Sequence, residues 1–187
     1  MASSKEYVNS GGMTPSTELL TDAFDRIRSV VHDATKELTP DELAFRVDSG
    51  ANSIAWLIWH LTRIHDDHLS DVMGREQLWT TEGWSRDFGL PFPASDTGFG
   101  HASEDVAAVR GLTAEQLVAY HDAVANRTRE YLSELSDDEL DRVVDESWDP
   151  PVTLGVRLVS VIGDSLQHAG QAAFLKGIIQ RRPSRDE

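Results

Sequence analysis

The chain has 187 residues, and its 32 acidic and 17 basic side chains give a net charge of −15. This length suits one domain with a sizeable core, and the charge repels nucleic-acid phosphates and anionic membrane faces, so neither is expected as a partner. There is no cysteine, which excludes disulfides, thiolate metal ligands and a cysteine nucleophile from the chain itself.

The first residues differ in composition from the rest of the chain. Residues 1–13 are small and polar with paired glycines, and they predict a disordered leader ahead of one domain over residues 14–183. This leader has no apolar signal-peptide core, and the longest apolar stretches of the chain are too short to span a membrane. We therefore expect a soluble, cytoplasmic protein.

Four segments carry the three- and four-residue spacing of apolar side chains that is typical of amphipathic helices. They cover, in chain order, about residues 14–38, 52–73, 113–135 and 153–179, each with Thr, Ser or Asn at its start as a helix cap. Residues 38–43, 112–117 and 135–140 also share one helix-start pattern. Four long helices with a long crossover between the second and third predict an all-α four-helix bundle.

The crossover, residues 74–111, is rich in glycine and proline but also in aromatic side chains, which argue against disorder. Short helical turns are expected around Trp79 and around residues 104–110. Two interpretations stay open for Trp79, Trp84 and Phe88: they pack the crossover onto the bundle, or they line a substrate pocket. Arg127 of the third helix has a similar pair of alternatives, a structural role or the anchoring of an anionic substrate group.

Three polar residues on apolar helix faces indicate a metal site. Asp164 and His168 are four residues apart, one helical turn, so both can point at the same spot. His60 lies on the apolar face of the second helix, where an ionisable group is costly unless something compensates it. A divalent metal would compensate it, and three protein ligands leave positions open for water or substrate. The alternative for Asp164 and His168 is a polar pair without a metal.

The other histidines lack a partner pattern and are expected at the surface. His65 points well away from His60, and His32, His101 and His121 have no ligand-like neighbours in the sequence. His68 lies two turns from His60, about 12 Å along the helix axis, which is too far to share one metal. It is expected to be a solvated polar residue, and the alternatives are that it lines a lower pocket or makes a supporting hydrogen bond.

Two stretches of the sequence resemble the DinB-like superfamily, and more closely its branch related to thiol transferases. They are residues 52–61, Asn-Ser-Ile-Ala-Trp-Leu-Ile-Trp-His-Leu, and residues 164–171, Asp-Ser-Leu-Gln-His-Ala-Gly-Gln. The resemblance implies a four-helix bundle with a divalent metal, often zinc or nickel, and frequent homodimers. By position, His60 and His168 match metal ligands. Asp164 stands where many members have histidine and the mycothiol-dependent maleylpyruvate isomerases have glutamate.

The resemblance also implies a reaction. Characterised relatives activate a low-molecular-weight thiol such as mycothiol or bacillithiol, which the metal binds as thiolate and presents to an electrophile. A chain without cysteine fits this scheme, because the nucleophile arrives with the cosubstrate. The leading hypothesis is a metal-dependent thiol S-transferase or isomerase. The alternatives are a stress-related bundle that binds a metal or small ligand without turnover, and a metal-assisted hydrolase.

Overall fold

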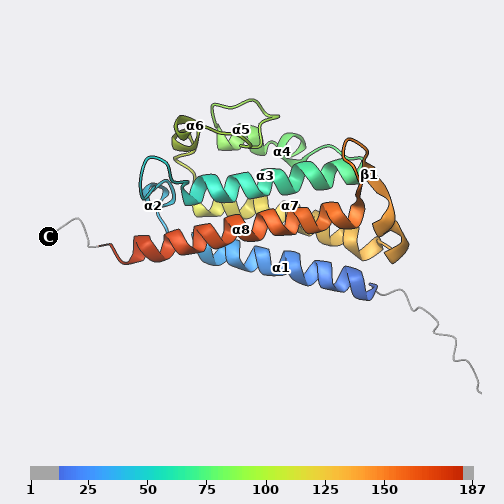
Figure 1. Ribbon diagram of the computed structural model, residues 1–187. Helices are drawn as coiled ribbons and strands as arrows, with labels where there is room; N and C mark the ends of the chain where they lie inside the picture. The colour runs from blue at the N-terminus through green and yellow to red at the C-terminus, as the bar shows by residue number, and fades with distance from the viewer. Residues whose placement is uncertain (1–12, 183–187) are drawn as a thin grey trace, which may run out of the picture.

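Four long helices, α1, α3, α7 and α8, pack side by side in the computed structural model, which describes residues 13–182 (Figure 1). The elements in chain order are α1 (Pro15–Thr35), α2 (Pro40–Leu43), α3 (Ile54–Met73), α4 (Leu78–Thr81), α5 (Trp84–Phe88), α6 (Ser103–Ala108), α7 (Ala114–Glu134), the 3-10 helix η1 (Asp137–Asp141), β1 (Val143–Asp145), β2 (Val152–Thr153) and α8 (Leu154–Gln180). The predicted four-helix bundle is confirmed. The predicted disordered leader lies outside the described residues, apart from Met13.

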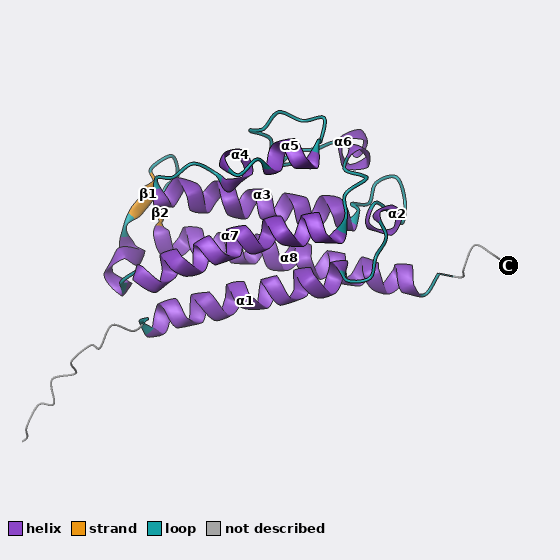
Figure 2. Ribbon diagram, turned by 180° about the vertical axis from the view of Figure 1, so that it is seen from behind, coloured by secondary structure: helices purple, strands orange, loops and turns teal. Residues whose placement is uncertain are grey.

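Helix α8 occupies the middle of one face of the bundle, between α1 and α3, and packs closely against both (Figure 1). Helix α7 lies on the opposite face, where it also contacts α1 and α3 (Figure 2). Their inward side chains form one apolar core, in which Ile27, Leu61, Leu132 and Leu158 are fully buried. Within residues 13–182, no helix is long and apolar enough to cross a membrane.

Side-chain caps fix where the long helices begin. The caps are Thr14, Ser53, Thr113 and Thr153, and each accepts a hydrogen bond from a backbone N–H of the first turn. The shared helix-start pattern is confirmed as well, because Thr39, Thr113 and Ser136 each form a capping box with the residue three positions later. The β1–β2 hairpin was not predicted, because strands of two and three residues are too short to show an alternating period.

The crossover between α3 and α7 contains α4, α5 and α6 and lies over the side of α3 that faces away from α1 (Figure 1). Because the crossover covers one side of α3 and the bundle covers the other, every residue from 53 to 63 is buried. This two-sided cover explains how α3 keeps several polar side chains away from water.

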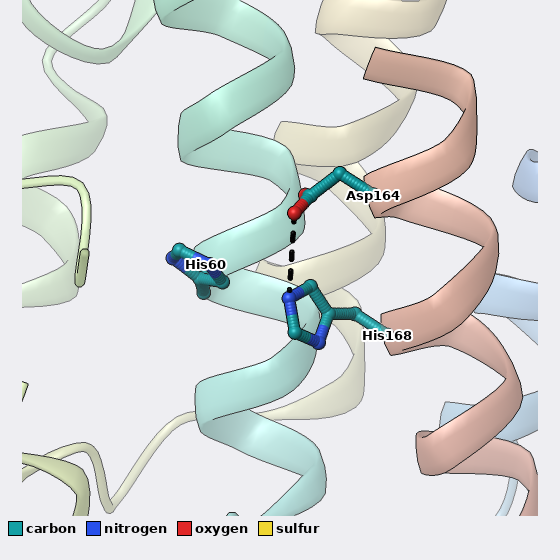
Figure 3. Close-up of side chains that lie close together, drawn as sticks. All are labelled: His60, Asp164 and His168. Carbon is teal, nitrogen blue, oxygen red and sulfur yellow. Dashed lines mark ion pairs between the residues drawn. The ribbon is translucent and has the colours of Figure 1, made fainter. Parts of the chain in front are cut away.

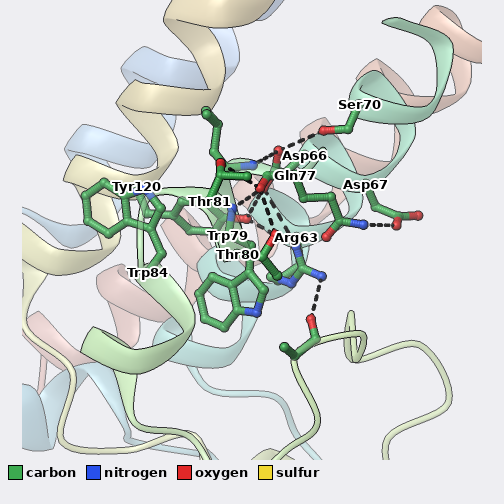
Figure 4. Close-up of polar contacts among 12 residues, drawn as sticks. Arg63, Asp66, Asp67, Ser70, Gln77, Trp79, Thr80, Thr81, Trp84 and Tyr120 are labelled. Carbon is green, nitrogen blue, oxygen red and sulfur yellow. Dashed lines mark hydrogen bonds and ion pairs between the residues drawn. The ribbon is translucent and has the colours of Figure 1, made fainter. Parts of the chain in front are cut away.

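The buried carboxylate of Asp66 on α3 forms hydrogen bonds that hold the crossover against this helix (Figure 4). It is fully buried, and it accepts hydrogen bonds from the Trp79 backbone N–H at 2.8 Å, the Tyr120 hydroxyl at 2.9 Å and the Arg127 guanidinium at 2.6 Å. The guanidinium of Arg63, also fully buried, lies 3.8 Å away. With the Ser70 hydroxyl of α3, which donates at 3.1 Å, donors from α3, α4 and α7 meet at one carboxylate. They compensate the charge that burial would otherwise penalise.

Candidate metal centre

His60 on α3 and Asp164 and His168 on α8 point toward one another across the contact between the two helices (Figure 3). Each offers one ligand atom, and these atoms all lie within 4.8 Å of one another. His60 is buried, whereas Asp164 and His168 are only partly covered. The convergence predicted from the sequence is therefore present, and two of the three side chains are partly exposed to solvent.

Hydrogen bonds at Nδ1 of both imidazole rings leave the Nε2 atoms as the candidate metal ligands. His60 Nδ1 donates to the carbonyl of Thr97 at 2.6 Å, since a carbonyl can only accept. His168 Nδ1 donates to the side-chain oxygen of Gln171 at 3.0 Å, and its Nε2 lies 3.5 Å from Asp164 Oδ1. Such bonds to the second ring nitrogen fix the tautomer and orientation of metal-binding histidines.

The pKa shifts of the triad favour an ionised Asp164 carboxylate with a positive charge beside it. Burial lowers the pKa of His60, which favours the neutral form of its imidazole. Burial raises the pKa of Asp164, but His168 and His60 outweigh this and the pKa of the carboxyl is lowered overall. The same carboxylate raises the pKa of His168. A proton on His168 Nε2 and a metal cation would thus serve the same purpose beside an ionised carboxylate.

A divalent metal fits these residues. The second carboxylate oxygen, Asp164 Oδ2, is buried and has no hydrogen-bond partner among the described residues. Two neutral imidazoles and one carboxylate form a donor set that suits zinc, nickel and similar divalent ions. His60, Asp164 and His168 would hold the ion, and the unpaired oxygen is what a cation at this position would satisfy.

The remaining residues predicted for the site gather elsewhere. The rings of Trp79, Trp84 and Phe88 surround Tyr120, with centroid distances of 5.2, 5.6 and 5.8 Å. Arg127 donates to Asp66 and to the backbone carbonyl of Glu76. These contacts agree with the packing and structural alternatives. A role in a substrate pocket stays a prediction.

Three histidines were wrongly expected at the surface. His65 and His121 are buried, with 1% and 0% of their surface exposed, and the His101 side chain is only 7% exposed. His65 does point away from His60, but toward Phe24 of α1, on which its ring stacks at 4.8 Å. The direction was inferred correctly, and the error was to assume that solvent lay there.

Sequence reasoning missed the groups that hold His60. Thr97 acts through its backbone carbonyl, which no side-chain pattern reveals. Gly98 has a φ of +88°, and a Cβ there would lie 2.9 Å from both His60 Nδ1 and the Trp59 ring. The chain passes so close to His60 that only glycine fits. The Asp96-Thr97-Gly98 sequence was the available signal, since Asp and Gly two residues apart favour a tight turn.

Comparison with known proteins shows the family to which the chain belongs. Fold and triad define a DinB-like four-helix bundle with a candidate metal centre. A sequence profile described as mycothiol-S-transferase matches residues 19–180, and the chain belongs to this family. It is also similar to a conserved protein from Enterococcus faecalis known from a crystal structure, with 30% identity and a TM-score of 0.83 over 89% of this chain and 98% of that one. No curated protein matches the chain.

Proposed function

We propose that this protein is a metal-dependent thiol S-transferase that uses mycothiol or a related low-molecular-weight thiol. The observation that carries the proposal is the convergence of three ligand atoms from His60, Asp164 and His168 within 4.8 Å, in a chain of the mycothiol-S-transferase family. The chain contains no cysteine, so the nucleophilic sulfur has to come from a cosubstrate.

The protein's own residues prepare the site before any substrate arrives. His60 and His168 hold their Nε2 lone pairs toward the centre because Thr97 and Gln171 occupy the opposite ring nitrogens. Asp164 adds the negative charge that a divalent cation needs. A bound divalent metal supplies Lewis acidity, which lowers the pKa of a ligated thiol so that thiolate exists at neutral pH.

The overall reaction balances with a thiol and an electrophile alone. The thiol sulfur forms a bond to the electrophilic carbon, the leaving group departs with its bonding electrons, and the thiol proton goes to solvent. Asp164 and His168 are partly exposed, so both the thiol and the released proton have a route at this side of the site. Isomerisation would follow the same first step, with the thiol adding to a carbon–carbon double bond and leaving again.

The first test is metal analysis of protein purified without chelators or an affinity metal column. We expect near-stoichiometric zinc or nickel in the wild type and loss of metal in His60→Ala and His168→Ala. His32→Ala is the matched control, since His32 pairs with Asp122 on the other side of the bundle. A wild-type protein that is purified without metal and does not bind added zinc or nickel contradicts the proposal.

The second test measures conjugation of mycothiol and of bacillithiol to a generic electrophile. A metal-dependent rate that disappears with His60→Ala supports transfer. Stoichiometric metal without such a rate, for either thiol, supports the alternative of a bundle that binds metal without turnover.

The resemblance also predicts a homodimer. The outer face of α8 exposes Val159, Leu166 and Phe174, whose spacing places them along one side of the helix. Apolar side chains in such a row suit a contact between two copies. Sedimentation of the wild type and of Leu166→Glu tests this: we expect a dimer that dissociates in the variant.

A further inference from the structure

A series of hydrogen bonds links His60 to a tight turn of the crossover. Asp96 Oδ1 accepts the backbone N–H of Gly98 at 2.8 Å, and this turn presents the Thr97 carbonyl to His60 Nδ1. The other carboxylate oxygen, Asp96 Oδ2, accepts a hydrogen bond from His101 Nε2 at 3.1 Å. Asp96 therefore shapes the turn that holds His60 and is itself held by His101.

Trp56 closes the series into a ring. Its indole N–H donates to His101 Nδ1 at 3.1 Å, and its ring stacks on His60 with a centroid distance of 4.6 Å and an interplanar angle of 18°. Trp56 also meets the ring of His168 edge-on at 6.2 Å. The same indole thus contacts both imidazoles of the triad and the histidine that supports the turn.

The order of donors and acceptors in this ring is fixed. An indole N–H can only donate, so His101 Nδ1 has to accept and His101 Nε2 has to carry the hydrogen. The hydrogen on His101 Nε2 needs an acceptor, and so does the backbone N–H of Gly98. An ionised Asp96 carboxylate offers one acceptor oxygen to each of these two donors. Burial raises the pKa of Asp96, but the bonds from Gly98 and His101 lower it overall. Both nitrogens of His101 are engaged, so it is not placed to take a proton from a substrate.

Arg63 fixes the backbone of the turn to α3. Its guanidinium is fully buried and donates to the carbonyl of Asp96 at 3.2 Å and to that of Ala94 at 3.3 Å. Arg63 stands three residues after His60, on the same part of α3. The imidazole and the carbonyl that orients it are thereby tied to one helix.

We propose that Asp96 and His101 are positioning residues for the metal ligand His60. They hold the turn that keeps His60 in the Nδ1–H tautomer, whose Nε2 carries no hydrogen and can bind a metal. The inference rests on the metal site proposed above. It adds two residues that lie outside the triad, and it assigns a role to a histidine with no ligand-like neighbours in the sequence.

The test compares isosteric and conservative variants. Asp96→Asn keeps the shape but brings an amide N–H₂ against either His101 or Gly98, so one donor loses its acceptor. His101→Leu removes the contact, whereas His101→Gln retains an acceptor for Trp56 and a donor for Asp96. Asp122→Asn is the matched control, since Asp122 makes the same kind of contact with His32, at 2.8 Å, between α1 and α7.

Two readouts are taken on each variant. Titration with Co²⁺, followed by its visible absorption, gives the dissociation constant, and long-range ¹H–¹⁵N NMR of metal-free protein gives the tautomer of His60. We expect Asp96→Asn and His101→Leu to weaken Co²⁺ binding about 10- to 100-fold and to populate the Nε2–H form of His60. His101→Gln and Asp122→Asn should stay close to wild type in both measurements.

The outcomes separate this inference from the proposed function. Wild-type Co²⁺ affinity together with an unchanged His60 tautomer in Asp96→Asn and His101→Leu overturns the positioning role, even if the wild type binds metal. An equal loss of Co²⁺ affinity in Asp122→Asn also overturns the positioning role, because the loss would then not depend on contact with the turn that holds His60. A wild type that binds no Co²⁺, but whose Nδ1–H form of His60 is lost in Asp96→Asn, refutes the metal chemistry and supports the positioning role. Circular dichroism of each variant verifies folding.

Discussion

Two imidazoles in the bundle core make the stability of this protein dependent on pH. His121 Nδ1 donates to the Thr62 hydroxyl at 3.2 Å, because that hydroxyl gives its own hydrogen to the Ile58 carbonyl. The opposite nitrogen, His121 Nε2, is buried without a partner among residues 13–182, and the same holds for His65 Nδ1. A proton added at either atom would be a buried charge without a hydrogen-bond acceptor among residues 13–182.

The size of the effect follows from the pKa of His121, which burial lowers from 6.5 to about 4. Above pH 6.5 the residue is neutral in both the folded and the unfolded chain and has no effect on stability. Between pH 6.5 and 4 the unfolded chain binds a proton that the folded chain does not, so stability falls as the pH falls. At 1.36 kcal/mol per unit, the full loss is about 3 kcal/mol. Burial also lowers the pKa of His65, which acts in the same direction.

The assay is urea unfolding of metal-free protein between pH 7.5 and 4, for the wild type and for His121→Asn. Asparagine retains a donor for Thr62 but does not titrate. A change in packing therefore shifts the unfolding free energy of the variant by the same amount at every pH, while the pH dependence due to residue 121 disappears. We expect the difference in unfolding free energy between the two proteins to change by about 3 kcal/mol in favour of the variant at low pH. A difference that stays constant over this range would refute the reasoning.

Three further predictions concern the crossover and the triad. Asp66→Asn should lower the free energy of unfolding by about 3 kcal/mol, measured in urea, because it leaves the fully buried guanidinium of Arg63 without its carboxylate. Gly98→Ala should weaken metal binding more than Gly100→Ala, since both glycines have positive φ but only at Gly98 would a Cβ meet His60; equal affinities in a metal titration would contradict this. Asp164→Glu should retain metal in elemental analysis, as the carboxylate is kept, whereas Asp164→Leu should lose it.

The sequence by itself determined the bundle. Apolar spacing and caps such as Thr14, Thr113 and Thr153 are local properties, and these three long helices begin where the caps predict. For the other long helix the sequence offered Asn52 or Ser53, and Ser53 is the cap. Two ligands of the candidate site were equally local, because one helical turn separates Asp164 from His168. His60 required an additional inference, the cost of an imidazole on an apolar face, and the resemblance to a known family pointed to the same residue.

Only the tertiary structure decided which polar groups are buried and what holds them. The crossover covers α3 on its outer side, so Arg63 and Asp66 are buried, and a single-helix pattern contains no information about such cover. His101 shares a ring of contacts with His60 although 41 positions separate them in the chain. Thr97 contributes a backbone carbonyl, a group that every residue possesses. Where a carbonyl points depends on the path of the whole chain, and that path is set by long-range packing rather than by the residues on either side.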